Sequence, residues 1–357
     1  MPDRRSYDVA AYIWPSYHNE PRMVDVWKEG DGEWYTVRRG TPRFPGHDMP
    51  KLPLLGYQDE ADPAVMREQV AIGAAHGVNT FIVDWYWYEQ QPCFERQLND
   101  ALLPALSGSD SWFYLMWANH NATSLWNMHT DADEPRWTAR VDRKAFEAMA
   151  ERLIERYLGH PRCYRIDSRP VLSIYDLPNL IAGLGSCEAT ASALAWLRAR
   201  VAAHGLPGVH LQAINTVWVS IEGLSFAELI RRLGFDSATD YQFAHHGPGK
   251  GDYVGWAQRS WSQWDAWAKA YPCWYPHVSV GWDNTHRMPS EKEIITGNTP
   301  EAFKACLFRA KRFLDAHPNQ APLVTINSWN EWTEGSYLLP DMRWGYGYLE
   351  AIRAVFR

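Results

Sequence analysis

The sequence predicts a single α/β domain over residues 1–357, folded as a (β/α)8 TIM barrel. Three observations lead to this fold class. Eight short apolar runs alternate with amphipathic helical patterns from one end of the chain to the other. A length of 357 residues lies within the range of one such barrel. No glycine-rich phosphate loop follows the first run, which argues against the alternative of an open doubly wound sheet.

The eight apolar runs are short and contain many β-branched residues. This composition is typical of parallel strands that are covered on both faces. In chain order the predicted strands are Val9–Trp14, Thr80–Trp87, Trp112–Asn119, Pro170–Asp176, Val209–Ile214, Phe235–Gln242, His277–Asn284 and Leu323–Trp332.

The helices between these runs show clear start signals and apolar faces. Asp62 precedes Pro63, and Thr299 precedes Pro300, which is the pattern of an N-cap followed by proline in the first turn. Two longer helices are predicted from apolar residues at helical spacing. One contains Phe146, Met149, Ala150, Leu153, Ile154 and Tyr157, and the other contains Phe303, Cys306, Leu307, Ala310, Phe313 and Leu314.

Two segments interrupt the alternation, residues 18–57 after the first strand and residues 122–137 after the third. Both lack a clean period and contain Trp, Pro and charged residues. Irregular segments of this length in a compact domain are usually functional or disordered. Because their aromatic content disfavours disorder, we expect two long ordered loops.

The composition indicates a carbohydrate partner and excludes others. The net charge of −7 argues against nucleic acid or an anionic membrane, since both attract a basic surface. The chain has 20 Trp, 18 Tyr and 12 Phe, more flat aromatic surface than a core needs. Aromatic platforms suit the apolar faces of sugars, whereas the alternative interpretation is an aromatic-rich core. The oligomeric state is left open.

The start of the chain and its apolar segments bear on where the protein resides. Residues Met1–Ser6 lack the separate apolar region of a secretory leader, and no stretch is apolar enough to span a membrane. We therefore expect a cytoplasmic protein, with a leader removed before this sequence begins as the alternative.

The sequence predicts neither a cofactor nor a metal. Its 5 Cys are scattered without a C-x-x-C pair, which argues against disulfides and a zinc cluster. His245 and His246 are neighbours whose side chains point to opposite faces of a strand. The trio His120, His246 and Asp283 is a weak candidate, because a hydroxyl-binding role suits these side chains better. No G-x-S-x-G elbow or P-loop is present.

Polar and aromatic residues gather at the carboxyl ends of the predicted strands, where a (β/α)8 barrel places its active site. Asp84 and Asp176 have a structural alternative, since both can cap loops. The candidate substrate-binding residues are Trp14, Tyr17, Asp84, Trp85, Trp87, Trp117, Asn119, His120, Asp176, Tyr241, His246, Trp282, Asp283, Asn284, Trp329 and Asn330.

The most specific signal is SWNEWTEG, residues 328–335, directly after the last strand. Glu331 and Glu334 are three residues apart, so a helical turn would place them on one face, with Cβ atoms about 5–6 Å apart. Glycoside hydrolysis uses two carboxyl groups, one protonated and one ionised. Burial and like-charge repulsion can separate their pKa values. The structural alternative is a helix N-terminus that carries acids because they suit the helix dipole.

The chain resembles the glycoside hydrolase family 99-like proteins, also called WbsX-like, which are relatives of the endo-α-mannosidases. The resemblance covers almost the whole chain. It rests on TPRFPGHDMPKLP (Thr41–Pro53), WAN (Trp117–Asn119), HPRCYRIDSRPVLSIY (His160–Tyr175), GWDNTHR (Gly281–Arg287) and SWNEWTEGSYLLPD (Ser328–Asp341). Many members continue WAN with an acidic residue and Trp, where this chain has His120, Asn121 and Ala122.

The resemblance implies a (β/α)8 barrel that acts on glycan or polysaccharide chains with retention of anomeric configuration. It implies that Glu331 takes the proton of the sugar 2-hydroxyl and that Glu334 is the general acid and base. Two other functions are compatible with the same residues. One is a polysaccharide-biosynthesis glycosyltransferase or transglycosidase, and the other is a glycan-binding barrel without catalysis.

Overall fold

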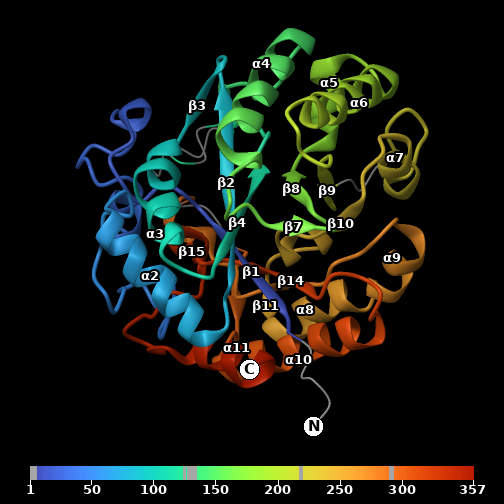
Figure 1. Cartoon of the computed structure of the whole chain (residues 1–357). Coiled ribbons are helices and arrows are strands. Elements are labelled where there is room, and N and C mark those ends of the chain that lie inside the picture. The colour runs from blue at the N-terminus through green and yellow to red at the C-terminus, as the bar shows by residue number, and fades with distance from the viewer. Residues whose placement is uncertain (1–5, 124–125, 127–134, 217–219, 289–292) are drawn as a thin grey trace.

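The computed structural model describes residues 6–123, 126, 135–216, 220–288 and 293–357. Parallel strands lie at the centre of the molecule, and helices surround them (Figure 1). The predicted fold class is confirmed, because all eight apolar runs form barrel strands. These are β1 (Asp8–Ile13), β2 (Thr80–Tyr88), β4 (Trp112–Trp117), β8 (Arg169–Ile174), β9 (His210–Ile214), β10 (Ser237–Thr239), β12 (His277–Ser279) and β14 (Leu323–Asn327).

The strands are hydrogen-bonded in the order β10-β9-β8-β4-β2-β1-β14-β12, so that the first strand of the chain pairs with the last. Closure between β10 and β12 is made by the residues just before β12. Ala238 and Trp274 form a parallel bridge there. The Ala238 amide donates to the Cys273 carbonyl (2.9 Å), and the Tyr275 amide donates to the Ala238 carbonyl (3.0 Å). The barrel is therefore nearly closed.

Helices connect the strands on the outside of the barrel. The predicted N-caps are confirmed, since Asp62 accepts from the Ala64 amide and Thr299 accepts from the Ala302 amide. The helices are α2 (Pro63–His76), α3 (Leu103–Ser107), α4 (Arg143–Leu153), α5 (Leu177–Leu184), α6 (Cys187–Ala203), α7 (Phe226–Arg232), α8 (Tyr253–Trp261), α9 (Trp264–Ala270), α10 (Pro300–Ala316) and α11 (Gly347–Phe356). Two π-helical turns, η2 (Gln97–Leu102) and η4 (Ile154–Leu158), extend α3 and α4.

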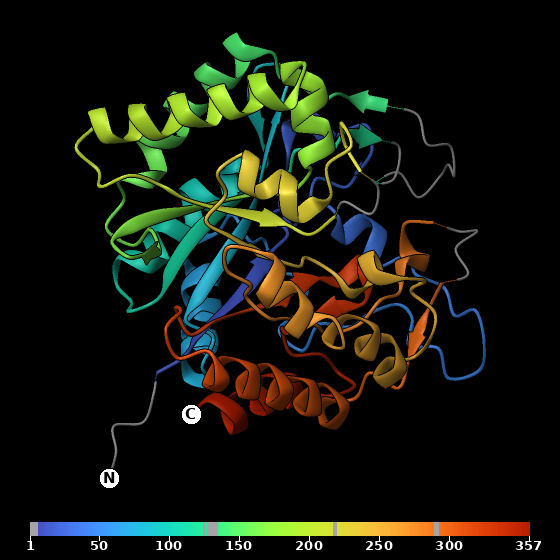
Figure 2. The same cartoon turned by 90° about the vertical axis from the view of Figure 1, so that its right-hand side faces the viewer.

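The last helix completes the ring. α11 packs against both α10 and α2, so the C-terminal and N-terminal parts of the chain are neighbours (Figures 1 and 2). In the described part of the chain, no single helix has the length and apolar character to cross a bilayer. By length and composition alone, α5 and α6 reach that threshold only as a pair bent by 97°.

Several strands end earlier than predicted. Residues 175–176, 240–242, 280–284 and 328–332 leave the sheet, because their polar and aromatic side chains form the βα loops instead of the ladder. Two of these loops contain short turns of their own. They are η5 (Phe243–His246) after β10 and η6 (Asn284–His286) after β12.

The long loop after β1 is ordered as expected and contains η1 (Pro21–Met23) and α1 (Trp34–Val37). In the loop after β4, β5 (Ala122–Thr123) pairs with β6 (Pro135–Trp137). The rest of the predicted 122–137 loop, apart from Trp126, lies outside the described residues. The remaining short strands are β3 (Gln91–Cys93), β7 (Arg165–Ile166), β11 (Gly251–Asp252), β13 (Ile295–Thr296), β15 (Asn330–Glu331) and β16 (Ser336–Tyr337).

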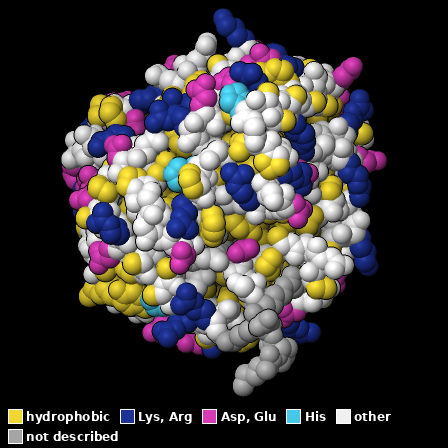
Figure 3. Space-filling model, viewed as in Figure 1, with side chains coloured by type: hydrophobic (Ala, Val, Ile, Leu, Met, Phe, Trp, Pro, Cys, Tyr) yellow, Lys and Arg dark blue, Asp and Glu magenta, His cyan; other side chains and the backbone are white. Residues whose placement is uncertain are grey.

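Polar side chains fill part of the barrel interior. Thr325 of β14 contacts Thr239 of β10 and His277 of β12, each at 2.9 Å. Tyr114 of β4 donates to Gln212 of β9 at 3.2 Å. These hydrogen bonds satisfy buried polar groups that would otherwise be costly. Outside, on the face in Figure 3, basic side chains are interspersed with acidic ones.

Candidate active site

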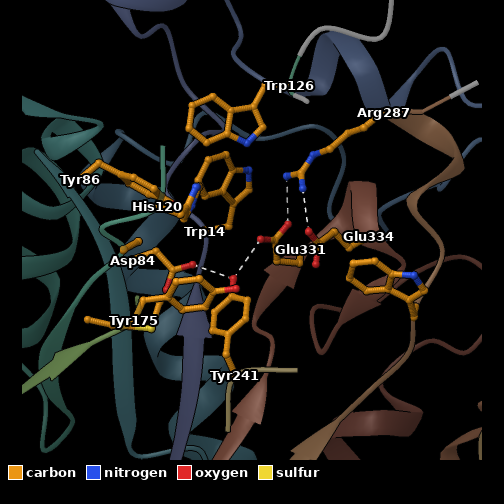
Figure 4. Close-up of a pocket in the computed structure, with 13 residues that line it drawn as sticks. Trp14, Asp84, Tyr86, His120, Trp126, Tyr175, Tyr241, Arg287, Glu331 and Glu334 are labelled. Atoms are coloured by element: carbon orange, nitrogen blue, oxygen red, sulfur yellow. Dashed lines mark hydrogen bonds and ion pairs between the residues drawn. The ribbon is translucent and has the colours of Figure 1, made fainter. Parts of the chain in front are cut away.

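A cavity of about 230 Å³ opens at the carboxyl ends of the barrel strands, where the βα loops meet. Figure 4 shows acidic and aromatic side chains that point into it from several loops. Its lining residues are Trp14, Asp84, Tyr86, Met116, Ala118, His120, Trp126, Tyr175, Tyr241, Trp282, Arg287, Glu331 and Glu334.

Glu331 and Glu334 lie in the same cavity, on the tight turn that follows β14. Glu331 ends β15, and Glu334 ends the 3-10 helix η7 (Trp332–Glu334). Ser328 Oγ accepts a hydrogen bond from the Glu331 amide at 2.7 Å. The next residue, Gly335, has φ +61°, and a Cβ there would lie 2.9 Å from the Asp283 side chain. Glycine therefore lets the turn pass close to the loop after β12.

Arg287 joins the two acids. Its Nη2 donates to Glu331 Oε2 at 3.2 Å, and its Nη1 donates to Glu334 Oε1 at 2.8 Å (Figure 4). The guanidinium is buried and lies 5.4 Å from the Trp14 ring centroid. One cation thus contacts both carboxylates from a single side of the cavity.

A third acid lies behind Arg287. Glu33, at the start of α1, accepts from Arg287 Nε at 2.6 Å and from Nη2 at 3.0 Å. Trp14 Nε1 donates to the same carboxylate at 2.5 Å, and Ser16 Oγ donates at 3.2 Å. Glu33 is fully buried and does not line the cavity. Its charge acts on the site through Arg287.

On the opposite side of Glu331, a tyrosine hydroxyl lies between two carboxyl groups. Tyr241 contacts Asp84 Oδ2 at 2.8 Å and Glu331 Oε1 at 3.2 Å (Figure 4). A hydroxyl has one proton, so it can donate to only one of the two acids. A protonated Asp84 would donate to Tyr241, and Tyr241 would then donate to Glu331.

Burial raises the pKa values of the acids in the cavity. Desolvation raises the pKa of Asp84 well above its ordinary value. Desolvation, followed by the charge of Glu334, does the same to the pKa of Glu331. Desolvation also raises the pKa of Glu334, against the opposing effect of Arg287. Glu33, Glu331 and Glu334 contact the one guanidinium, and burial favours the protonated forms of Glu331 and Glu334.

Aromatic rings wall the cavity and pack against one another. Trp14 contacts Trp126 at 5.3 Å and Tyr86 at 5.4 Å between ring centroids. Tyr86 contacts the His120 ring edge-on at 5.6 Å. Desolvation lowers the pKa of His120, so that its imidazole is neutral at pH 7. The walls are therefore preformed and uncharged.

Of the residues singled out from the sequence, seven line this cavity and the others do not. The seven are Glu331, Glu334, Trp14, Asp84, His120, Tyr241 and Trp282. Trp85, Trp87, Trp117 and Trp329 lie among the helices instead. For the three tryptophans on strands β2 and β4, the reason is that side chains alternate along a strand. Trp85 donates to Glu95, Trp329 donates to Gln69, Trp87 stacks on Trp85, and Trp117 packs on Phe146.

The remaining residues from that set hold loops in place. Asn119 exchanges hydrogen bonds with the Asp176 backbone, and Asp176 caps α5. Asn330 binds both the amide and the carbonyl of Trp14. Tyr17 accepts from the Trp332 amide, His246 contacts Asp240, and Asn284 is buried outside the cavity.

Asp283 lines a second cavity of about 220 Å³, which shares Trp282 with the first. The Arg43 amide donates to His47 Nδ1 (3.0 Å), and His47 Nε2 lies 2.8 Å from Asp283. This places the His47 proton on Nε2. Burial opposes ionisation of Asp283, but the hydrogen bond from His47 and the charge of Lys51 lower its pKa to about 2.

Six residues of the main cavity are outside the predicted set of site residues: Tyr86, Met116, Ala118, Trp126, Tyr175 and Arg287. The two-residue alternation of β2 links Tyr86 to Asp84, and the GWDNTHR stretch contains Arg287. Among the residues that the structure describes, no group of three or more His, Cys, Asp or Glu is arranged to hold a metal ion. His120, His246 and Asp283 make separate contacts with Asn121, Asp240 and His47.

Comparisons with known proteins agree with this architecture. A family model described as glycosyltransferase WbsX matches residues 9–352. Two WxcX proteins of Xanthomonas campestris pv. campestris, both described as uncharacterized, are 28% identical over 369 residues. The alignment covers 99% of this chain and 50% of each relative, so the chain spans about half the length of these relatives.

Solved structures of glycoside hydrolases share the fold. The GH99 endo-α-mannosidase from Bacteroides thetaiotaomicron is 15% identical, with a TM-score of 0.65 over 97% of this chain and 95% of that one. A glycoside hydrolase-like protein is 13% identical, with a TM-score of 0.65 over 100% of this chain and 96% of that one. A GH5_18 protein from Streptomyces cattleya, in complex with GlcNAc, has 12% identity and a TM-score of 0.53 over 82% of this chain and 74% of that one.

Proposed function

The chain belongs to the family described as glycosyltransferase WbsX, and from this premise we propose that it is a retaining, mannosidase-like glycoside hydrolase acting on a glycan or polysaccharide. One observation carries the proposal. Glu331 and Glu334 share an aromatic-walled cavity in which a single arginine contacts both. Two neighbouring carboxyl groups whose pKa values are raised by burial can provide the acid and the base that glycoside cleavage needs.

The hydrogen bonds favour different roles for the two acids. Glu331 accepts on both oxygens, from Tyr241 and from Arg287, which favours its ionised form. Glu334 accepts from Arg287. Burial raises the pKa of Glu331 further than that of Glu334. We nevertheless assign the role of base to Glu331 and the mobile proton to Glu334, because the resemblance to endo-α-mannosidases implies these roles from the positions of the two acids in the motif.

The resemblance to endo-α-mannosidases implies a two-step reaction with these groups. In the first step the sugar 2-oxygen attacks its own anomeric carbon and gives its proton to Glu331. Glu334 protonates the departing glycosidic oxygen, and an epoxide-like sugar remains. In the second step Glu334 takes a proton from water as the water oxygen bonds to the anomeric carbon. Glu331 returns its proton to the 2-oxygen, and configuration is retained. The neighbouring hydroxyl supplies proximity as an effective-molarity gain.

The two adjoining cavities support a substrate longer than one sugar. Trp282 lines both cavities. Glu334 lines the main cavity, and the next residue in the chain, Gly335, lines the second cavity. A leaving group protonated by Glu334 would therefore extend past Trp282 into the second cavity. This favours an oligo- or polysaccharide over a monosaccharide glycoside.

The description of the family favours transfer as a second candidate function. In a transglycosidase the same two acids would act, and a sugar hydroxyl would replace water in the second step. A glycosyltransferase would instead depend on a nucleotide-sugar donor. A third possibility, glycan binding without turnover, would leave the acids without a chemical role.

The test is a screen of α-mannosides and bacterial polysaccharides, with the anomeric form of the first product followed by NMR. Glu334→Gln and Glu331→Gln should each lower turnover about 10²-fold or more, since each removes a proton-transfer group. Glu301→Gln, at an exposed position on α10, is the charge-matched control and should retain turnover. A 2-deoxy substrate should be inert.

Each other outcome identifies a different function. Normal hydrolysis of the 2-deoxy substrate would exclude the 2-hydroxyl mechanism. Turnover only with a nucleotide-sugar donor would establish a glycosyltransferase. Binding without turnover, unchanged by Glu331→Gln, would establish a binding protein.

A further inference from the structure

The buried acid behind Arg287 has a role that the two-carboxylate mechanism does not include. Glu33 is absent from the lining of the main cavity and is completely buried, so it does not touch a substrate there. It nevertheless makes the most extensive contact with Arg287, through Nε at 2.6 Å and Nη2 at 3.0 Å. This two-point contact is the strongest arrangement of an arginine and a carboxylate.

The contact determines how much positive charge reaches the reacting acids. Arg287 uses Nη1 for Glu334 and shares Nη2 between Glu33 and Glu331. Without Glu33, an uncompensated cation would lie directly against both acids and favour the ionised form of each. The site would then lose the protonated group that must donate to the leaving oxygen.

We propose that Glu33 is a positioning residue that holds Arg287 between Glu331 and Glu334 and cancels its charge, so that the two acids keep one proton between them. The inference rests on the proposed function for its catalytic meaning. The assignment of charge itself depends only on the buried contacts.

The loop after β1 is built to hold Glu33 in this place. The Glu33 amide donates to the Ser16 carbonyl at 3.1 Å. Gly32, with φ +66°, lies so close to this backbone that a Cβ would be 1.9 Å from the Ser16 carbonyl oxygen. Trp14 Nε1 and Ser16 Oγ both donate to Glu33 Oε2. Four donor atoms, including two of Arg287, therefore converge on one carboxylate and fix its position.

Other titratable groups surround the two reacting acids, and they stay the same when Glu33 is changed. Their influence therefore cancels in a comparison of variants. They come from the loop after β1, from β2, and from the loops after β4, β8 and β10: Tyr17, Asp84, Tyr86, His120, Tyr175 and Tyr241.

The first experiment compares pH profiles of kcat/KM for the wild type and Glu33→Gln. Removing the negative charge lets Arg287 lower the pKa values of both Glu331 and Glu334. Glu331 must be ionised and Glu334 protonated, so both limbs of the profile should move to lower pH, by about one unit or more. Glu33→Asp keeps the charge and should restore the wild-type limbs even if kcat is lower.

Glu29→Gln is the matched control, because it removes one negative charge from an exposed position of the same loop. Glu29 pairs with Arg38 and Arg39. The pH profile of kcat/KM for Glu29→Gln should coincide with that of the wild type. If Glu33→Gln has a lower kcat/KM but both limbs of its pH profile lie at the same pH as in the wild type, Glu33 is only structural. That result would overturn the proposal.

A second measurement needs no substrate. Protein labelled with 13C at the Glu carboxyl carbon is titrated by NMR, and the Glu331 and Glu334 signals are identified from their loss in the Gln variants. In Glu33→Gln both signals should titrate at lower pH than in the wild type, and in Glu33→Asp they should not. Unmoved titrations in folded Glu33→Gln would refute the inference.

If Glu33→Gln fails to fold, Glu33→Asp decides, because signals shifted to lower pH there would refute it. A protein that turns over no glycan but shows the shift would refute the proposed function alone.

Discussion

Tyr241 shows how one hydroxyl links two buried acids. It lies 2.8 Å from Asp84 and 3.2 Å from Glu331, and it packs edge-on against Tyr12. Its hydroxyl favours the ionised form of Glu331, and in the proposed mechanism this would support Glu331 as the base.

We expect Tyr241→Phe to lower kcat about 10- to 100-fold, which corresponds to the loss of one hydrogen bond to a charged group. The pKa of Glu331 should rise, since the ionised form loses a donor, and the acidic limb of the pH profile should move to higher pH. Steady-state kinetics across pH measures both effects. Tyr12→Phe is the matched control, because its hydroxyl donates to the Asp240 carbonyl outside the cavity, and an equal loss in both variants would contradict the role of Tyr241.

Individual site residues differ in how far the sequence predicts them. Glu331 and Glu334 are predictable because they are close in sequence and follow a strand directly. Arg287 is 44 positions from Glu331, and only the tertiary contact relates the two. Trp85 and Trp87 look like site residues by position, but the alternation along β2 turns both toward the helices. Tyr86 is two residues from Asp84 and therefore lies on the same face of β2 as Asp84.

At the scale of elements, the loop after β1 depends on one glycine. Gly32→Ala would place a Cβ 1.9 Å from the Ser16 carbonyl oxygen, so the loop must move and take Glu33 with it. We expect a loss of about 1–3 kcal/mol in the free energy of unfolding, together with lower turnover. Chemical denaturation and kinetics measure the two effects.

Gly30→Ala is the matched control in the same loop. Gly30 also has a positive φ, +78°, but a Cβ there would meet nothing within 4 Å. Gly30→Ala should therefore cost only about 1 kcal/mol, the cost of placing alanine in a left-handed backbone conformation. Equal destabilisation by the two substitutions, with turnover retained in both, would show that the close approach at Gly32 does not position the loop.

The elements themselves follow closely from local sequence signals. Eight apolar runs and two capped helices are found where they are predicted, because burial and capping are encoded within a few residues. The strand ends differ, since a polar residue such as Asp240 finds a better partner in a loop than in the barrel ladder. The π-helical turn at Gln97–Leu102 and the two-residue strands β15 and β16 have no local signal and depend on tertiary packing.

For the whole molecule, stability should depend on a buried acid outside the cavity. Burial raises the pKa of Glu60 to about 7, although Gln69, Gln97 and Asn330 donate to it. The pKa in the unfolded chain is near 4.5. The stabilisation from this raised pKa is complete below pH 4.5 and is lost as the pH rises through 7, because the folded state binds the extra proton.

We expect the wild type to lose about 2 kcal/mol more stability between pH 5 and pH 8 than Glu60→Gln does. Urea denaturation at the two pH values measures the difference. The exposed Glu68 on α2 provides the control, since Glu68→Gln should show the same change in the free energy of unfolding between the two pH values as the wild type. If the free energy of unfolding changes equally between pH 5 and pH 8 in the wild type, Glu60→Gln and Glu68→Gln, Glu60 stays ionised in the folded state.

The choice between a barrel and an open sheet is also a property of the whole molecule. Length and alternation favour the barrel, but the pairing of β1 with β14 and the bridge between Ala238 and Trp274 close it. These contacts join parts of the chain that are far apart in sequence, so no local pattern encodes them. The same contacts bring Glu33 from the first loop to Glu331 at the last.

The pairing of β1 with β14 has a consequence for biosynthesis. A ribosome releases the first strand early and must extend the chain by some three hundred residues before the last strand exists. During that interval one edge of β1 has no neighbour, and Glu33 and Arg287 have no second acid to face. The cavity that holds Glu331 and Glu334 therefore forms only when β14 docks against β1.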